Sequence, residues 1–192
     1  MPAEDSSAVE GRRTEQPRAA VPAVPSAVVD PDAPLFDSLG LSAATLEAVH
    51  RAGYSQPTPV QAGLIPRAIT GIDVLGQART GTGKTAAFVL PILERMAGAA
   101  AGSPGVRALV LVPTRELAVQ VRDEFEKLAH GSGVHCVAVY GGKPIKSQID
   151  KLARHPQVVV GTPGRVLDHM SRGTLDLRSL EIVTLDEADR ML

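Results

Sequence analysis

The sequence predicts an α/β fold in which one parallel sheet carries helices on both faces. Two observations lead to this expectation: short, almost wholly apolar runs rich in β-branched residues, and longer segments of helical periodicity that alternate with them after residue 34. Strands that are apolar throughout are typical of parallel sheets buried on both faces. Their alternation with helices implies right-handed strand–helix–strand crossovers.

The expected strands are the apolar runs 72–75, 108–112, 134–140, 158–160 and 182–185. The expected helices lie between them, near 42–51, 59–69, 83–97, 115–129, 145–154 and 164–171. Ser42 is of the residue type that caps helix N-termini, and Pro59 suits the first turn of a helix. Residues 35–192 are therefore expected to form one domain.

Residues 1–34 differ from the rest in composition. They hold six of the fifteen prolines, six acidic and three basic residues, and no helical or strand period. We expect a disordered tail. The rest of the chain carries 17 basic and 15 acidic residues, although the formal charge of the whole chain is -1. The near-neutral total therefore does not exclude a nucleic-acid partner.

Several classes of protein are excluded by composition. The chain is 44% hydrophobic and 21% charged, which is enough apolar material for a core. Cys136, the single cysteine, rules out an intramolecular disulfide and a Cys-based zinc site. No apolar run reaches the ~18 residues needed to span a bilayer, and the N-terminus lacks the order of a secretory signal. A cytoplasmic protein is expected.

The segment from Ala78 to Thr85 is a candidate phosphate-binding loop between an expected strand and an expected helix. The residues expected to contact a nucleotide are Thr80, Gly81, Thr82, Gly83, Lys84 and Thr85. Glycines let backbone N–H groups point at phosphate oxygens, and the helix N-terminus adds positive charge. Lys84 can reach the β- and γ-phosphates, and the Thr85 hydroxyl can bind Mg²⁺. The alternative is a glycine-rich turn with a surface lysine.

A candidate acidic site follows the apolar run 182–185, where Asp186, Glu187 and Asp189 occur. An acid at the C-terminal end of a buried parallel strand stands where ligands bind in open α/β sheets. We expect Asp186 to hold Mg²⁺ and Glu187 to orient and deprotonate the attacking water, so that Lys84, Asp186 and Glu187 are the catalytic residues. A solvated acidic helix start is the alternative.

These two segments together resemble the DEAD-box ATP-dependent RNA helicases of superfamily 2, whose P-loop also begins with Ala. Four further segments resemble motifs of that family in order: the Q motif at 53–61, motif Ia at 113–118, the paired glycines 141–142 and motif Ib at 162–165. Phe36 stands seventeen residues before Gly53, as that family's pattern requires. The resemblance covers residues 36–192 and leaves the tail outside.

The resemblance implies that ATP is bound through its base as well as its phosphates. The amide of Gln61 offers a donor and an acceptor side by side, which match N6 and N7 of adenine. Phe36 is expected to stack on the base. A core residue is the alternative for Phe36, and a simple helix-start residue is the alternative for Gln61.

The resemblance also implies sequence-independent binding of single-stranded RNA or a duplex end. The residues expected to contact RNA are Pro113, Thr114, Arg115, Gly141, Gly142, Thr162, Pro163, Gly164 and Arg165. They offer backbone N–H groups, hydroxyls and arginines at strand ends, and such groups bind phosphates and sugars without reading bases.

In this family ATP lies between two RecA-like domains, and residues 35–192 resemble the first of them, cut short after its acidic motif. The second domain, with its arginine finger, and a Ser-Ala-Thr motif have no counterpart in the sequence. The resemblance implies that the parent protein couples ATP hydrolysis to local unwinding of RNA. The 192-residue chain alone is expected to bind ATP–Mg²⁺ without efficient turnover. The alternative is a non-catalytic RNA- or partner-binding module.

Overall fold

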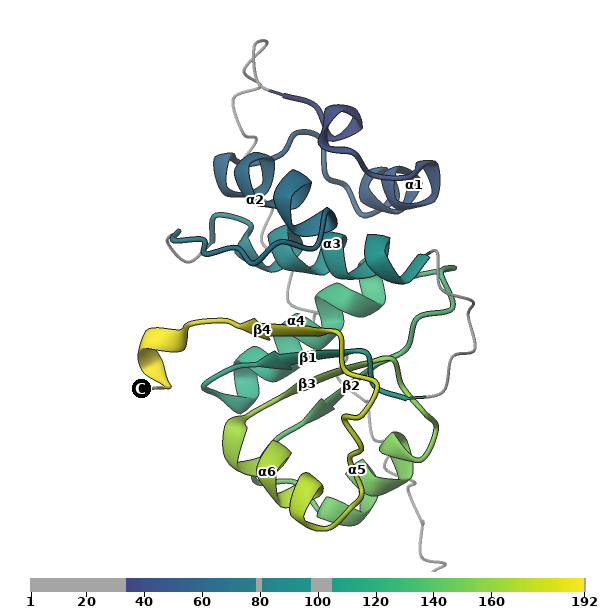
Figure 1. Cartoon of the computed structure of the whole chain (residues 1–192), viewed down its shortest axis with the longest axis vertical. Helices are drawn as coiled ribbons and strands as arrows, with labels where there is room; N and C mark the ends of the chain where they lie inside the picture. Colours follow the sequence, from purple (N-terminus) through teal and green to yellow (C-terminus); the bar gives the residue numbers. More distant parts are fainter. Residues whose placement is uncertain (1–33, 79–80, 98–104, 192) are drawn as a thin grey trace, which may run out of the picture. The chain divides into compact units, whose positions relative to one another are not determined.

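The computed structural model describes residues 34–78, 81–97 and 105–191 (Figure 1). All of these residues belong to one compact unit, Pro31–Leu192. The expected tail lies outside the described residues, apart from Pro34.

In the described ranges, four parallel strands form a single sheet. They are β1 (Ala108–Leu111), β2 (Cys136–Val139), β3 (Val158–Gly161) and β4 (Ile182–Leu185). Their order across the sheet is β2-β3-β1-β4, so that each connection crosses over a face of the sheet. Every pairing is parallel, as the apolar character of the runs predicts.

The fifth expected strand, 72–75, is wrong. This segment is extended but belongs to no strand of the described part of the chain, and Leu75 is fully exposed. It packs on α2 (Pro59–Ile69), where a Cβ on Gly76 would lie 2.8 Å from Leu64 Cδ1. A cavity of about 450 Å³ extends between this segment and β4. An apolar run becomes a strand only when a neighbour pairs with its backbone, and β4 pairs with β1 alone among the described strands.

The expected helices are confirmed, with ends within two residues of their predicted positions. Besides α2 they are α1 (Ala43–Arg51), α3 (Lys84–Ala97), α4 (Arg115–Leu128), α5 (Ile145–Leu152) and α6 (Pro163–Ser171). The part of the chain that the structure describes also contains two short 3₁₀ helices that were not predicted, η1 (Phe36–Leu39) and η2 (Ala188–Arg190). None of the helices in the described ranges is long and apolar enough to cross a membrane.

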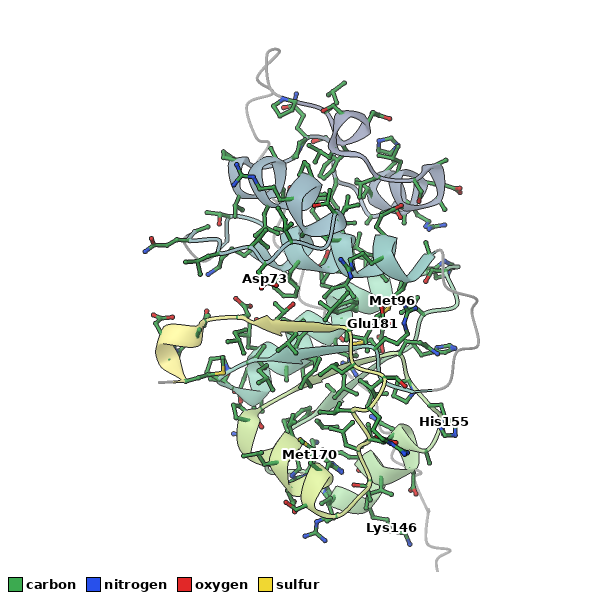
Figure 2. The ribbon with its side chains drawn as sticks, viewed as in Figure 1. Asp73, Met96, Lys146, His155, Met170 and Glu181 are labelled. Atoms are coloured by element: carbon green, nitrogen blue, oxygen red, sulfur yellow. The ribbon has the colours of Figure 1, made fainter. Side chains whose placement is uncertain are left out.

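Helices cover both faces of the sheet, and the side-chain alternation of β1 shows why. Ala108 and Val110 join the larger apolar cluster with residues of α3 and α4, whereas Leu109 joins a second cluster with Leu152 of α5 and Val166 of α6. In Figure 2, Met96 of α3 lies on one side of the sheet, and Lys146 of α5 and Met170 of α6 lie on the other. The predicted fold class is therefore confirmed.

Helix α1 is hydrogen-bonded to α3, the helix that follows the phosphate-binding loop. Ser42 caps α1, as expected. The carboxylate of Glu94 on α3 accepts hydrogen bonds from Ser42 Oγ at 3.0 Å and from Thr45 Oγ1 at 2.6 Å. Bonds of this kind to a charged group are stronger than neutral ones, so the start of α1 and the body of α3 are held together.

Candidate functional site

The four strands end at one level, which places the loops that follow them at one edge of the sheet. Leu111 of β1 pairs with Gly161 of β3 and with Leu185 of β4, and Gly161 also pairs with Val139 of β2. One residue beyond, Asp186 N still donates to the carbonyl of Leu111 at 3.0 Å. This carboxyl edge is where open α/β sheets bind ligands.

The phosphate-binding loop has the backbone shape that its glycines predict. Gly81 and Gly83 both adopt a φ of +82°, and α3 begins directly afterwards at Lys84. Thr80 lies outside the described residues. Left-handed glycines let successive N–H groups turn toward one side, and the helix N-terminus supplies four N–H groups without helical partners. The loop, with Thr82, Lys84 and Thr85, can therefore surround phosphate oxygens.

Gln61 is brought to this loop, but its amide is already engaged by the protein. The side chain is 1% exposed; its oxygen accepts from the Thr58 N–H at 2.9 Å, and its nitrogen donates to the Gly83 carbonyl at 3.0 Å. These bonds use one of the two amide hydrogens and one of the two oxygen lone pairs, and adenine recognition by Gln61 stays a prediction.

Phe36 lies in the core. Its ring is 1% exposed and meets the Tyr54 ring edge-on, with centroids 6.1 Å apart. Tyr54 in turn donates to Glu124 Oε1 of α4 at 2.5 Å, and its burial, together with this bond, raises the pKa of the phenol. The packing favours the core alternative for Phe36, and its stacking on adenine stays a prediction.

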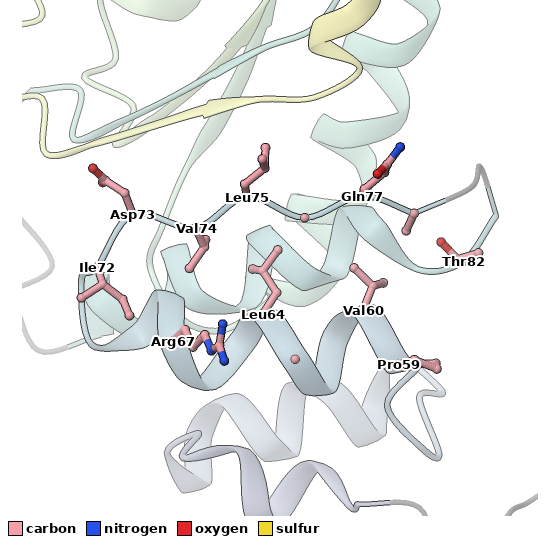
Figure 3. Close-up of a pocket in the computed structure, with 13 residues that line it drawn as sticks. Pro59, Val60, Leu64, Arg67, Ile72, Asp73, Val74, Leu75, Gln77 and Thr82 are labelled. Atoms are coloured by element: carbon pink, nitrogen blue, oxygen red, sulfur yellow. The ribbon is translucent and has the colours of Figure 1, made fainter.

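A cavity of about 610 Å³ lies beside the phosphate-binding loop, between α2 and the segment 72–78 (Figure 3). In Figure 3 the side chains of Val60 and Leu64 extend from α2 toward the segment 72–78. Thr82 forms part of the wall, whereas neither Phe36 nor Gln61 does. The volume is typical of ligand pockets, and the apolar lining suits a flat ring better than a phosphate.

The acidic residues occupy the end of β4. Asp186 is buried, and desolvation raises the pKa of its carboxyl group, an effect that the nearby positive charge of Lys84 opposes. The Asp186 carboxylate and the Thr85 hydroxyl, which follows Lys84 at the start of α3, are oxygen donors of the kind that Mg²⁺ prefers. The residues present therefore fit the expected metal. Asp189, three residues on, is exposed.

Glu187 stands in a strained conformation. Its φ of +52° and ψ of +46° are left-handed, which is uncommon for a residue with a Cβ. Its carboxylate accepts a hydrogen bond from Arg190 Nη1 at 2.7 Å. Strain of this kind gathers at functional sites, where the surrounding structure holds the residue in place.

The nine residues expected to contact RNA lie at the same edge, on the loops after β1, β2 and β3 and on the first residues of α4 and α6. Thr114 caps α4 by accepting from the Leu117 N–H at 3.2 Å, and Thr162 precedes α6. Arg115 passes Gly142 so closely that a Cβ there would lie 3.0 Å from its Nη1 atom. Arg165 donates to the Lys143 carbonyl at 3.2 Å. The loops after β1, β2 and β3 are thus in mutual contact.

Two polar residues of this region were not singled out from the sequence. Gln148 and His169 are both buried and both hydrogen-bonded. A signal for Gln148 was present, because it shares the apolar stripe of α5 with Ile145 and Leu152 at helical spacing. A glutamine in such a stripe requires partners for its amide.

Comparison with known proteins identifies the class to which this fold and site belong. The sequence profile of the DEAD/DEAH box helicases matches residues 58–192. The chain belongs to the DEAD/DEAH box helicase family. The DEAD-box ATP-dependent RNA helicase CshA of Geobacillus kaustophilus (strain HTA426) is 49% identical over 157 residues, which cover 82% of this chain and 33% of that protein. The chain thus spans about a third of that relative's length.

Two solved structures are similar. A DEAD box protein from the hyperthermophile Methanococcus jannaschii matches with a TM-score of 0.75 at 43% identity, over 82% of this chain and 42% of that one. The RNA-helicase Prp28 from Chaetomium thermophilum bound to ADP matches with a TM-score of 0.76 at 39% identity, over 82% and 39% of the two chains. Both support the RecA-like fold that the motifs imply.

Proposed function

We propose that the protein to which this chain belongs is an ATP-dependent RNA helicase, located in the cytoplasm, that couples ATP binding and hydrolysis to local separation of RNA strands. The proposal rests on one observation: the four strands of the sheet end side by side at one edge. This arrangement brings Lys84 and Asp186 to the same edge of the sheet as the loops after β1, β2 and β3.

In the nucleotide site, the N–H groups at the start of α3 and the ammonium of Lys84 bind the phosphates of ATP. Thr85 and Asp186 hold Mg²⁺, which supplies neutralising charge at the phosphate oxygens when bound. Glu187 orients water and accepts its proton, for which its carboxylate has to leave Arg190.

In the RNA site, Thr114, Thr162 and the backbone of Gly141 and Gly142 contact the sugar–phosphate chain, and Arg115 and Arg165 supply positive charge. Contacts of this kind fix a strand in place without reading its bases. Affinity should therefore fall steeply with salt and depend little on sequence.

The 192-residue chain alone is proposed to bind ATP–Mg²⁺ weakly and to hydrolyse it slowly, because its sequence contains no counterpart of the arginine finger. Such an arginine is worth a factor of roughly 10³–10⁵ in turnover. The test is an ATPase assay on this chain with and without single-stranded RNA, and turnover near ~1 s⁻¹ would contradict the proposal. Lys84→Ala should abolish binding of an ATP analogue, whereas Arg165→Ala should weaken RNA binding only.

A further inference from the structure

A buried histidine lies beneath the loops proposed to bind RNA. His169 of α6 is 0% exposed, and its ring has a polar neighbour on each side. Nδ1 lies 2.8 Å from Thr174 Oγ1, and Nε2 lies 3.4 Å from Oε1 of Gln148 on α5. The mechanism described above uses neither His169 nor Gln148, yet burying two such polar side chains is costly unless their hydrogen bonds are made.

Gln148 bonds the backbone of one residue with both ends of its amide. Its oxygen accepts from the Tyr140 N–H at 3.2 Å, and its nitrogen donates to the Tyr140 carbonyl at 3.0 Å. Tyr140 directly precedes Gly141 and Gly142, which are exposed. The side chain thus supplies the backbone of Tyr140, at the end of β2, with the two hydrogen bonds that a neighbouring strand would otherwise supply.

These contacts determine the protonation of His169. Because Gln148 Oε1 is fixed as an acceptor by the Tyr140 N–H, the ring nitrogen that faces it, Nε2, has to carry hydrogen. In this tautomer Nδ1 is an acceptor for the Thr174 hydroxyl, which also lies 3.1 Å from the His169 carbonyl. That carbonyl accepts from the Thr174 N–H at 3.0 Å whichever acceptor the hydroxyl takes. A neutral ring meets every requirement, in agreement with the lowering of the His169 pKa by burial.

A second contact, at the surface, joins α6 to the loop that follows β2. Arg165, at the start of α6, donates to the carbonyl of Lys143, which follows the paired glycines. The loop after β2 is therefore tied to α6 at its outer end by Arg165 and at its inner end by the chain from Tyr140 through Gln148 to His169.

We propose that Gln148 and His169 are positioning residues that hold the backbone of Gly141 and Gly142 and the N-terminus of α6 as one rigid RNA-phosphate-binding unit. The inference rests on the proposed RNA-binding function. Two groups of N–H donors bind successive phosphates more tightly when their separation is fixed beforehand, because binding then does not have to order them.

The first test replaces Gln148 by an apolar side chain of similar length. Gln148→Met should bind a fluorescent single-stranded oligouridine about tenfold more weakly at fixed low salt, the equivalent of one lost charge-assisted contact, with ATP-analogue affinity unchanged. The matched control is Gln157→Met. Gln157 also bonds backbone groups with both ends of its amide: its oxygen accepts from the His135 N–H at 2.9 Å, and its nitrogen donates to the His155 carbonyl. These bonds lie at the opposite end of the strands.

Gln157→Met should lower the melting temperature without weakening RNA binding. Equal loss of RNA affinity in both variants would indicate a general stability effect and overturn the inference. If the unaltered chain binds no oligouridine, the proposed RNA-binding function fails and the inference fails with it. If the unaltered chain binds and Gln148→Met binds equally well, the inference alone fails.

The second test uses rescue at His169. His169→Leu removes both ring contacts and should weaken oligouridine binding, whereas His169→Gln keeps a donor toward Gln148 and should recover part of the affinity. NMR supplies a readout independent of binding: Gln148→Met and His169→Leu should shift the amide signals of Gly141, Gly142 and Gly164 and leave those of Gly81 and Gly83 in place. Unmoved signals at the first three glycines would overturn the inference.

Discussion

The amide nitrogen of Gln61 donates a hydrogen bond of 3.0 Å to the carbonyl oxygen of Gly83. The oxygen of the same amide caps α2 through the Thr58 N–H. One buried side chain therefore joins the start of α2 to the phosphate-binding loop. Since the Gly83 carbonyl loses this partner if Gln61 turns toward a base, recognition of adenine and the shape of the loop are physically linked.

A pair of glycine substitutions separates this contact from the strain of the loop. Gly81 and Gly83 share a φ of +82°, but a Cβ at Gly81 meets open space, whereas one at Gly83 would lie 2.5 Å from Gln61 Nε2. Both alanine variants incur the cost of a left-handed Cβ, about 1–2 kcal/mol. Gly83→Ala should lose roughly a further 1–3 kcal/mol, because it also breaks the buried hydrogen bond.

Urea unfolding and titration with an ATP analogue measure this difference. Gly83→Ala should be the less stable of the two and the weaker in nucleotide binding. Equal effects of the two substitutions would show that Gln61 moves aside freely.

The burial of Asp186 should lower the stability of the fold, although the proposed function requires its charge. Burial raises the pKa of its carboxyl group, because the charged carboxylate loses its solvation in the folded chain. The charge therefore lowers the free energy of unfolding, and this loss of stability is complete at any pH above the folded pKa. Asp186→Asn should therefore raise the melting temperature at pH 7, by ~2–4 °C for about 1 kcal/mol. The gain should vanish at acid pH, below the ordinary carboxyl pKa of 3.8.

The same substitution should remove the dependence of ATP-analogue binding on Mg²⁺. Asp189→Asn is the matched control, since Asp189 is exposed on the same acidic segment and should change neither property. A variant Asp186→Asn that is destabilised at pH 7 would show that attraction by Lys84 outweighs desolvation.

The sequence predicted correctly those helices and strands whose formation depends mainly on their own residues. The helices were predicted because caps and periodicity are local, and four strands were predicted because each is apolar and finds a partner. The segment 72–75 has the same local pattern, but a strand also depends on a neighbour, which no local pattern contains. The P-loop glycines were identified from spacing, whereas the burial of Phe36 and the network of Gln148 and His169 follow from packing between distant segments.

The ion pair of Arg107 and Glu181 should make stability depend on pH. Arg107 donates from Nε and Nη2 to the two carboxylate oxygens of Glu181 at 2.7 and 2.9 Å, and these bonds lower the pKa of Glu181. A depressed folded pKa means that the stabilisation is complete above the ordinary glutamate pKa of 4.5 and is lost as the pH falls through the lower folded value. Glu181 is partly exposed, so the pair is worth about 1 kcal/mol.

Glu181→Gln should therefore be less stable than the unaltered chain at pH 7, and the difference should shrink as the pH is lowered below 4.5. Chemical unfolding across this range measures it. Asp176→Asn is the control, because Asp176 forms a similar two-oxygen pair with Arg178. The side chain of Arg178 is 90% exposed, against 10% for Arg107, so the loss of this solvent-screened pair should change stability little. A difference for Glu181→Gln that persists at low pH would assign the effect to something other than the charge.

The left-handed backbone of Glu187 should be measurable as stored strain. Glu187→Gly and Glu187→Ala both remove the carboxylate and its bond to Arg190, and they differ only in the Cβ that a φ of +52° disfavours. The glycine variant should be more stable by about 0.5–1 kcal/mol, the left-handed penalty less the extra entropy of glycine in the unfolded chain. His155, with a φ of +54°, stands outside the proposed site and should give the same ordering of its Gly and Ala variants. If alanine is the better residue at 187 while glycine is better at 155, Glu187 does not hold its left-handed conformation in solution, and the strain at this site is absent.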